Sequence, residues 1–439
     1  MHKPGHIANL SSTEKRELLA RLLHPHAQAS KPRDGDIIYQ QAPALERHRR
    51  LFPALANKDY FNYGAHGPLS RPALEAIVRS FEYAQASGPF SFETNIWVER
   101  EIEQARASIA SELRVAASSI VLTESISVGC NIVLWGIDWR PGDHLLISDC
   151  ENPGIVAAVE EVKRRFNLEV SVCPLRSTRD DSHAVAAVAR HLKPSTRLVV
   201  LSHVFWNTGE VMPLAEISRA CHDHSTPQGC VRILVDGAQS VGVLPLDLTL
   251  LAVDFYSFTG QKWWCGPEGV AGLYISPEAS SSLQPTFVGW RSLDARAHDS
   301  IMKQHTDGRR FEIGSAAYPL YSGLREALAI HHEWGSQQER YDRVCYLSRY
   351  FRQRLVELAN RNRFLSLACL QDAPPRAGII PVQLSGRSPI ELARFLESKK
   401  VIARAMADPA CLRVCVHYLT LEPELDRLVE EIEKFCTAS

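Results

Sequence analysis

Short apolar runs alternate with segments of helical periodicity along most of the chain from Tyr60 onward. The runs are rich in β-branched residues, a pattern typical of strands buried on both faces of a sheet. A stretch long enough for a crossover follows each run, which predicts a mostly parallel sheet covered by helices on both faces. We expect strands at 119–122, 144–148, 168–173, 197–202, 232–236, 254–258 and 270–275, and helices at about 72–87, 96–114, 129–136, 154–166, 183–192 and 214–224.

The pattern changes after about residue 306, where it predicts a smaller α+β domain. This part contains helical stretches at 319–361, 388–399 and 422–436 and apolar runs at 378–384 and 412–418. At the other end, an amphipathic helix at 11–23 precedes a polar, proline-containing segment that we interpret as a linker. We therefore expect a helix and linker over 1–36, a large domain over 37–305 and a small domain over 306–439.

Composition excludes several classes of protein. The chain has 439 residues with 49 Lys+Arg, 50 Asp+Glu and a net charge of -1, so it has no basic field for nucleic acid or an anionic membrane surface. Its 11 cysteines are odd in number and lack the spacing of a zinc site. No signal peptide or run of about 18 apolar residues occurs, so we expect a cytoplasmic protein without metal.

Two polar residues stand where buried strands are predicted to end. Asp236 closes the apolar run at 232–236, at an edge where a carboxylate is costly unless a cation meets it. Lys262 lies between two aromatic runs, where loss of hydration would lower its pKa and allow its amine to form an imine with an aldehyde. The alternatives are that Asp236 caps the next helix and that Lys262 makes a cation–π contact with a tryptophan.

A third segment offers a seat for phosphate. Thr123, Ser125 and Ser127 follow a strand at the start of a predicted helix, whose free amide groups and hydroxyls suit an anion. A pyridine that carries an aldehyde and a phosphate requires a lysine, a carboxylate for its ring nitrogen and such a seat. The three segments together therefore indicate pyridoxal phosphate (PLP).

These segments resemble the class-V aminotransferase and cysteine desulfurase group of PLP enzymes over about residues 55–435. The resemblance rests on SHVFWNTGEVMPL, LVDGAQSVG, FTGQKWWCGPEGVAGLYI and RFEIGSAAYP. Within the group, the cystine/cysteine C-S lyases are most similar, through FPALANKDYFNYGAHGPL, NIVLWGIDWRPGD, DCENPGIVA, TFVGWRS and ADPACLRVCVHYLT. The resemblance implies an α/β chain of PLP fold type I, aspartate-aminotransferase-like, with a large mostly parallel sheet domain and a small α+β domain.

The resemblance also implies roles for residues around the cofactor. Lys262 would be the Schiff-base lysine, Asp236 the partner of the pyridine nitrogen, and Gln239 a neighbour of the phenolic oxygen. The phosphate would be held by Ser127, the backbone at Ile126 and, from the neighbouring subunit, Ser315, which implies a homodimer. Thr259 matches the group's hydroxyl residue three positions before the lysine and would also bind the cofactor. Two positions depart from the group: Gln261 replaces the usual histidine before the lysine, and Asn152 replaces a histidine that stacks on the ring, so a proton shuttle there is in doubt.

Three further residues would face an amino-acid substrate. Arg413 matches the arginine that holds the α-carboxylate by a fork that lysine cannot supply. Arg404 matches a second arginine of the C-S lyases, or is a surface arginine. Trp290 would be a wall of the substrate pocket, or a core aromatic residue.

The implied activity is β-elimination from cysteine, cystine or an S-substituted cysteine, which gives pyruvate, ammonia and a thiol or persulfide. A cysteine desulfurase and an aminotransferase or epimerase remain alternatives. A desulfurase would need a nucleophilic cysteine, for which Cys411 is the nearest candidate. The 11–23 helix also resembles segments at module junctions of biosynthetic assembly lines, although a plain N-terminal helix is the preferred interpretation.

Overall fold

The computed structural model describes residues 44–227, 229–294, 303–361, 365–366 and 376–437. The chain divides into two units, Met1–Arg47 and His48–Ser439, and the elements discussed below belong to the second. The helix expected at 11–23 and its linker lie outside the described residues. The domain boundary expected at residue 305 stays a prediction.

A seven-stranded sheet with the order β2-β10-β9-β8-β5-β3-β4 forms the larger of two main sheets. Its pairs are parallel except those of β10, which is antiparallel to both β2 and β9. This confirms the mostly parallel sheet that the buried apolar runs predict. The strands are β2 (Ile120–Thr123), β3 (His144–Ser148), β4 (Glu169–Cys173), β5 (Thr196–Ser202), β8 (Arg232–Asp236), β9 (Phe255–Thr259) and β10 (Ala271–Ile275).

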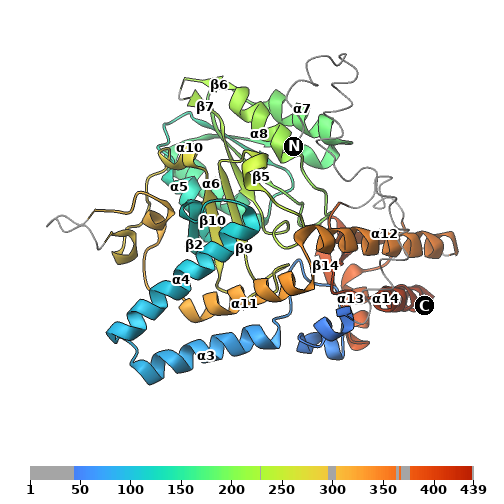
Figure 1. The fold of residues 1–439 in the computed structure, drawn as a ribbon. Coiled ribbons are helices and arrows are strands. Elements are labelled where there is room, and N and C mark those ends of the chain that lie inside the picture. The colour runs from blue at the N-terminus through green and yellow to red at the C-terminus, as the bar shows by residue number, and fades with distance from the viewer. Residues whose placement is uncertain (1–43, 228, 295–302, 362–364, 367–375, 438–439) are drawn as a thin grey trace, which may run out of the picture. The chain divides into compact units, whose positions relative to one another are not determined.

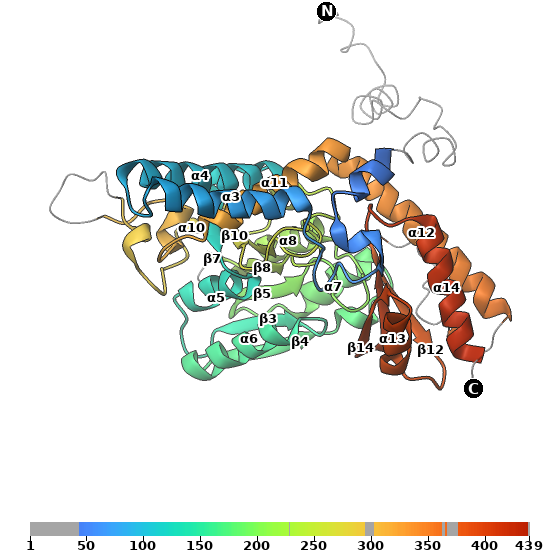
Figure 2. The ribbon, with the colours of Figure 1, turned by 90° about the horizontal axis from the view of Figure 1, so that it is seen from below.

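Helices cover both faces of this sheet. On one face lie α5 (Ile126–Gly136) and α6 (Pro153–Phe166), and on the other α7 (Asp181–His191) and α8 (Leu214–Asp223) (Figures 1 and 2). Three more helices lie side by side near its β2 end: α3 (Arg71–Ser87), α4 (Phe92–Leu113) and α11 (Tyr318–Trp334). Apolar side chains of α5, α6 and the strands form one continuous core, which fixes the ends of the strands relative to the helices that follow them.

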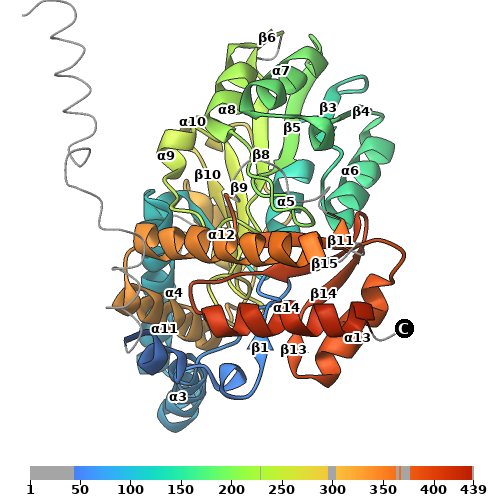
Figure 3. The same cartoon turned by 90° about the vertical axis from the view of Figure 1, so that its right-hand side faces the viewer.

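The second main sheet is antiparallel, with the order β11-β12-β15-β14. Two helices lie side by side over it and share its apolar core, α12 (Gln337–Arg361) and α14 (Glu422–Thr437) (Figure 3). Its other elements are β11 (Leu365–Ser366), β12 (Ile379–Leu384), α13 (Pro389–Ser398), β14 (Arg404–Ala407) and β15 (Ala410–Cys415). A separate parallel pair joins β1 (Asp59–Tyr60) to β13 (Val401–Ile402).

The single helical stretch expected at 319–361 is wrong, because the structure divides it into α11 and α12. Ser336 and Glu339 form a reciprocal cap at the division: the Glu339 amide donates to the Ser336 hydroxyl oxygen, and the Ser336 amide donates to the Glu339 carboxylate. Such a cap starts a new helix after Gly335. None of the described helices is both long and apolar enough to cross a membrane.

Candidate active site

The candidate site lies where parallel strands of the large sheet end. Asp236 is the last residue of β8, and its register partner on β5 is Ser202, also a last residue. Lys262 follows three residues after the end of β9. The carboxyl ends of parallel strands are where ligands bind in open α/β sheets. One cleft brings these groups together and is lined by Ile126, Ser127, Asn152, Ile155, Ser202, Val204, Trp206, Asp236, Ala238, Gln239 and Lys262.

The lysine and the aspartate of this cleft modify each other's ionisation. Burial lowers the pKa of Lys262 to about 8, although Asp236 acts in the opposite direction. Burial raises the pKa of Asp236, and the nearby charge of Lys262 and a hydrogen bond from the Ala238 amide (2.8 Å) counteract this rise. A lysine with such a pKa has a substantial fraction of free amine near neutral pH, which is the form that attacks an aldehyde.

The amino end of α5 faces the same cleft. Ser125 caps the helix by accepting from the Val128 amide, while Ile126 and Ser127 line the cleft itself. The Ser257 hydroxyl donates to the Ile126 carbonyl (2.9 Å) and ties the turn to β9. Free amide groups at a helix start attract phosphate, so this turn suits one.

Other predicted cofactor residues take defined positions. Gln239 is fixed because its amide group donates to the Gly64 carbonyl and its oxygen accepts from the Trp263 ring, both at 2.9 Å. Thr259 donates to the Gln261 side chain, but neither residue lines the cleft. Asn152 does line the cleft, and it also caps α6 through the Gly154 amide (2.9 Å).

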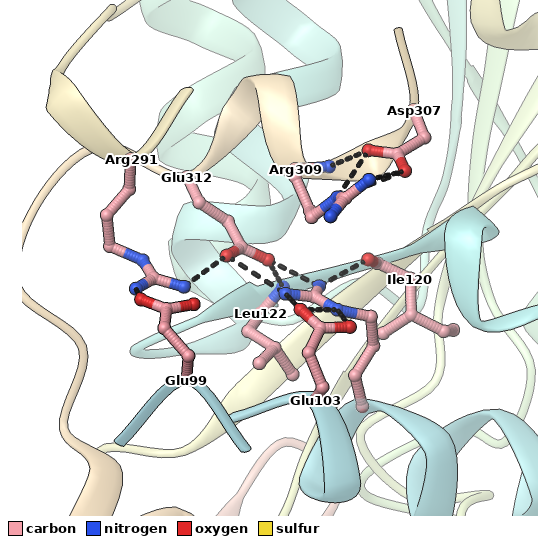
Figure 4. A network of polar contacts seen from close by, with 9 residues as sticks. Glu99, Glu103, Ile120, Leu122, Arg291, Asp307, Arg309 and Glu312 are labelled. Carbon is pink, nitrogen blue, oxygen red and sulfur yellow. Dashed lines mark hydrogen bonds and ion pairs between the residues drawn. The ribbon is translucent and has the colours of Figure 1, made fainter. Parts of the chain in front are cut away.

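A larger groove of about 680 Å³ adjoins the cleft at Ser127 and contains Ser315 on its lining. Glu312 is part of this lining and lies within a network of polar contacts (Figure 4). Its carboxylate accepts from two nitrogens of Arg106 on α4, from the Leu122 amide of β2 (3.0 Å) and from Arg291 (3.4 Å). The network therefore joins α4, β2 and the segment of Ser315, and within one chain Ser315 lies outside the Lys262 cleft.

Arg413 of β15 is the strongest indication of a substrate site. Its side chain is 1% exposed, and it donates to the Trp206 carbonyl (2.8 Å) and to Asn62 Oδ1 (3.4 Å). Its Nε has no hydrogen-bond partner, and no carboxylate among the described residues pairs with it. A buried guanidinium without an anion is costly, which indicates that a ligand carboxylate completes it.

The two remaining substrate residues differ in position. Arg404 of β14 is the register partner of Arg413, so the two cationic side chains start from adjacent backbone positions, and Arg404 is exposed. Trp290 is 62% exposed, so the alternative that it is a core aromatic residue is wrong. Trp290 is also absent from the lining of the cleft, so within one chain the structure does not bring it to Lys262.

Sequence reasoning missed several residues of the site, among them Ser202, Trp206 and Cys415. Ser202 and Trp206 line the cleft, and a signal existed for Ser202 as the last residue of a predicted strand. Cys415 and Arg413 both have side chains next to Gly64. A Cβ added to Gly64 would stand 3.0 Å from the Cys415 sulfur and 3.3 Å from Arg413 Cζ. His203 and His417 make hydrogen bonds in the core, to Tyr256 and to the Trp263 carbonyl.

Comparison with known proteins identifies similar structures and relatives. Two solved structures are 42% identical to the chain: a mutant of C-DES with glycine covalently linked to its PLP cofactor (TM-score 0.83, 88% of this chain and 98% of that one) and the complex of the cystine C-S lyase C-DES with its reaction product cysteine persulfide (TM-score 0.82, 87% and 99%).

More distant relatives have other activities. An isopenicillin N epimerase of Streptomyces clavuligerus is 29% identical over 87% of this chain and 95% of its own, and a probable cysteine desulfurase of Methanothermobacter thermautotrophicus is 24% identical over 88% and 96%. The model of one family, aminotransferase class-V, matches residues 60–434. The chain therefore belongs to the class-V aminotransferase family, whose members use pyridoxal phosphate as their cofactor.

Proposed function

We propose that the protein is a PLP-dependent C-S lyase that eliminates sulfur from the β-carbon of cysteine, cystine or an S-substituted cysteine. The observation that carries this proposal is the buried, anion-free Arg413 at the cleft of Lys262, which suits the carboxylate of an α-amino acid. The similarity of the chain to C-DES, a cystine C-S lyase, favours a sulfur-containing substrate. The products would be pyruvate, ammonia and a thiol or, from a disulfide, a persulfide.

The residues of the cleft have the chemistry that PLP requires. Lys262 would hold its aldehyde carbon, Asp236 its ring nitrogen, and Ile126 and Ser127 its phosphate, with Gln239 near the phenolic oxygen. When bound, the cofactor withdraws electrons from the bonds at the substrate's α-carbon. Trp206 and Asn152 would form the remaining walls, and Asn152 is engaged as a helix cap rather than free to carry a proton.

Two side chains of the protein would act on the substrate itself. Arg413 would fix the α-carboxylate, and the register partner Arg404 would add positive charge at the entrance. Once the substrate's amino group has replaced Lys262 at the aldehyde carbon, the released amine of Lys262, whose pKa burial lowers to about 8, would take the α-proton. Once the bond between the α-carbon and its hydrogen is broken, the sulfur group leaves the β-carbon with the electron pair of the carbon–sulfur bond. No protein nucleophile is required.

The cysteines favour elimination over desulfuration. A desulfurase needs an accessible thiolate that attacks the substrate's sulfur. None of the cysteines that the structure describes is exposed, and both Cys411 and Cys415 on β15 are 0% exposed. Cys369 lies outside the described residues. We therefore expect pyruvate and ammonia rather than alanine and an enzyme persulfide.

Product analysis tests this proposal. Holoenzyme is incubated with cystine, cysteine and S-alkyl cysteines, and pyruvate, ammonia and alanine are quantified, with Lys262→Ala as the inactive control. We expect equal amounts of pyruvate and ammonia, and Cys411→Ser and Cys415→Ser should each keep most of the activity. Alanine as the main product, together with an inactive serine variant at either position, would make the protein a desulfurase; racemised or transaminated substrate would indicate the epimerase or aminotransferase alternative.

We also propose that the active form is a homodimer. Large apolar side chains are exposed around the groove, with Phe287 at 68%, Trp290 at 62% and Ile313 at 44%. Exposed apolar area of this kind usually marks an interface. Continuity of the groove with Ser127 would allow Ser315 of a second copy to approach the phosphate seat, as the family resemblance implies. A place in a biosynthetic assembly line, which the resemblance of the 11–23 helix to module junctions suggests, stays a prediction.

A further inference from the structure

A second buried carboxyl group, Glu151, lies next to the Asp236 end of the cleft and has no part in the proposed reaction. Its side chain joins the carboxyl ends of two strands. One oxygen accepts from the Ser148 hydroxyl of β3 and the Ser202 amide of β5 (2.9 Å), and the other accepts from the Ser202 hydroxyl (2.7 Å). Glu151 is 7% exposed, and no cation among the described residues forms an ion pair with it.

Ser202 links this carboxyl group to the cofactor site. It lines the cleft and is the register partner of Asp236 on the neighbouring strand. Glu151, Ser202 and Asp236 therefore occupy adjacent strand ends at the place where the ring nitrogen would be held. The charge of Asp236 acts on Glu151, so the two carboxyl groups cannot both be ionised without a cost, and a protonated ring nitrogen held by Asp236 would reduce that cost.

We propose that Glu151 is a positioning residue for the cofactor, a second acid whose ionisation strengthens the hold of Asp236 on the protonated ring nitrogen. The inference rests on PLP binding in the cleft and not on which reaction follows. Glu151 itself does not line the cleft, so its negative charge would act on Asp236 from behind the lining, with Ser202 as the residue that contacts both Glu151 and the cleft.

The ionisation of Glu151 falls in the range where such an effect is measurable. Burial raises its pKa to about 7, hydrogen bonds from Ser148 and Ser202 oppose the rise, and the charge of Asp236 adds to it. Cys130 of α5 also faces Glu151, but burial raises the pKa of that thiol well above its ordinary value, so Cys130 stays neutral. Below about pH 7 Glu151 is mostly neutral, and above it the site gains a second negative charge.

Glu151→Gln is a well-matched variant. Its oxygen can accept from the Ser148 hydroxyl and the Ser202 amide, while its NH₂ group donates to the Ser202 hydroxyl oxygen, so the shape and all three contacts are retained without charge. The control is Asp254→Asn. Asp254 is also buried, but it lies at the opposite end of β8 from the cleft, where it binds Arg232, His222 and the Ile233 amide.

The experiment measures the dissociation constant of PLP, by absorbance and fluorescence of the bound cofactor, from pH 6 to 8.5. Wild type and Glu151→Gln should bind equally at pH 6, and wild type should bind about threefold or more tightly than the variant at pH 8.5, the equivalent of half a pKa unit. The absorption band of PLP bound to the variant should keep its low-pH form over a wider pH range than that of PLP bound to wild type. Asp254→Asn should differ from wild type by a constant factor at every pH.

A ratio of dissociation constants between wild type and Glu151→Gln that stays constant with pH would overturn the inference. Loss of PLP binding by wild type itself would instead refute the cofactor site. Thermal unfolding of the apoproteins identifies a variant that fails to fold, and Ser202→Ala then provides a second test: removal of the linking hydroxyl should shift the pH at which the affinity changes.

Discussion

Arg413 is the residue on which the substrate assignment depends. Its position between the Trp206 carbonyl and Asn62, with an unpaired Nε, presents a fork to a carboxylate. Arg413→Lys keeps the charge and loses the fork, so we expect kcat/KM to fall about 30- to 1000-fold, or about 2–4 kcal/mol in transition-state binding. Steady-state kinetics measure the loss, and cofactor absorbance should be unchanged.

Arg404→Lys serves as the control for this prediction, because Arg404 is exposed and forms no part of the buried fork. It should lose much less activity than Arg413→Lys. Normal kinetics in Arg413→Lys combined with a large loss in Arg404→Lys would reverse the roles of the two arginines.

At this scale the sequence predicts polar residues at, or shortly after, the ends of strands. Asp236, Lys262, Asn152 and Ser127 do line one cleft, because strand ends of a parallel sheet meet. Trp206 and Cys415 could not be predicted, since their place depends on how the β15 strand meets the β5 end. Trp290 shows the converse limit: its motif is recognisable, but in one chain the side chain is exposed outside the cleft.

At the scale of elements, the contact between α5 and β9 sets the position of the phosphate turn. Gly129 of α5 lies against Ser257, whose hydroxyl donates a hydrogen bond to the Ile126 carbonyl. A Cβ added at Gly129 would stand 2.2 Å from the Ser257 hydroxyl oxygen. Gly129→Ala should lower the free energy of unfolding by about 1–3 kcal/mol from overpacking, partly offset by about 1 kcal/mol of helix propensity. Denaturant unfolding and PLP affinity measure the two consequences.

Ser257→Ala distinguishes this clash from a general effect of alanine. The double variant lacks the oxygen that the new methyl group meets, so the penalty of Gly129→Ala should be smaller in that background. Equal penalties in both backgrounds would show that α5 relaxes away from β9 in another direction.

The elements also show where periodicity alone is insufficient. Buried apolar runs predict the strands well, because a strand covered on both faces leaves little choice of residue. The division between α11 and α12 was missed because apolar periodicity continues across it, whereas the capping pair of Ser336 and Glu339 ends one helix and starts another. The pairing of β1 with β13 joins positions far apart in sequence, which no local pattern encodes.

At the scale of the whole molecule, the groove and its apolar rim predict self-association. Phe287→Asp would place an unpaired charge in the proposed interface, so we expect the dimer dissociation constant to rise about 30- to 1000-fold, equivalent to about 2–4 kcal/mol. Wild type should elute with twice the chain mass of 49.1 kDa in light-scattering chromatography, and the variant should approach that mass on dilution.

The control is Leu250→Asp, which places a charge at an exposed apolar residue of α9 (Leu248–Leu251), outside the groove; Leu250 is 73% exposed. That variant should stay dimeric. If Ser315 of the second copy completes the phosphate seat, Phe287→Asp should also lose PLP in parallel with dissociation, and Ser315→Ala should weaken PLP binding while the dimer persists. A monomeric wild type that retains PLP would contradict the homodimer and would leave the groove to another occupant, because one chain would then hold the cofactor with its own cleft alone.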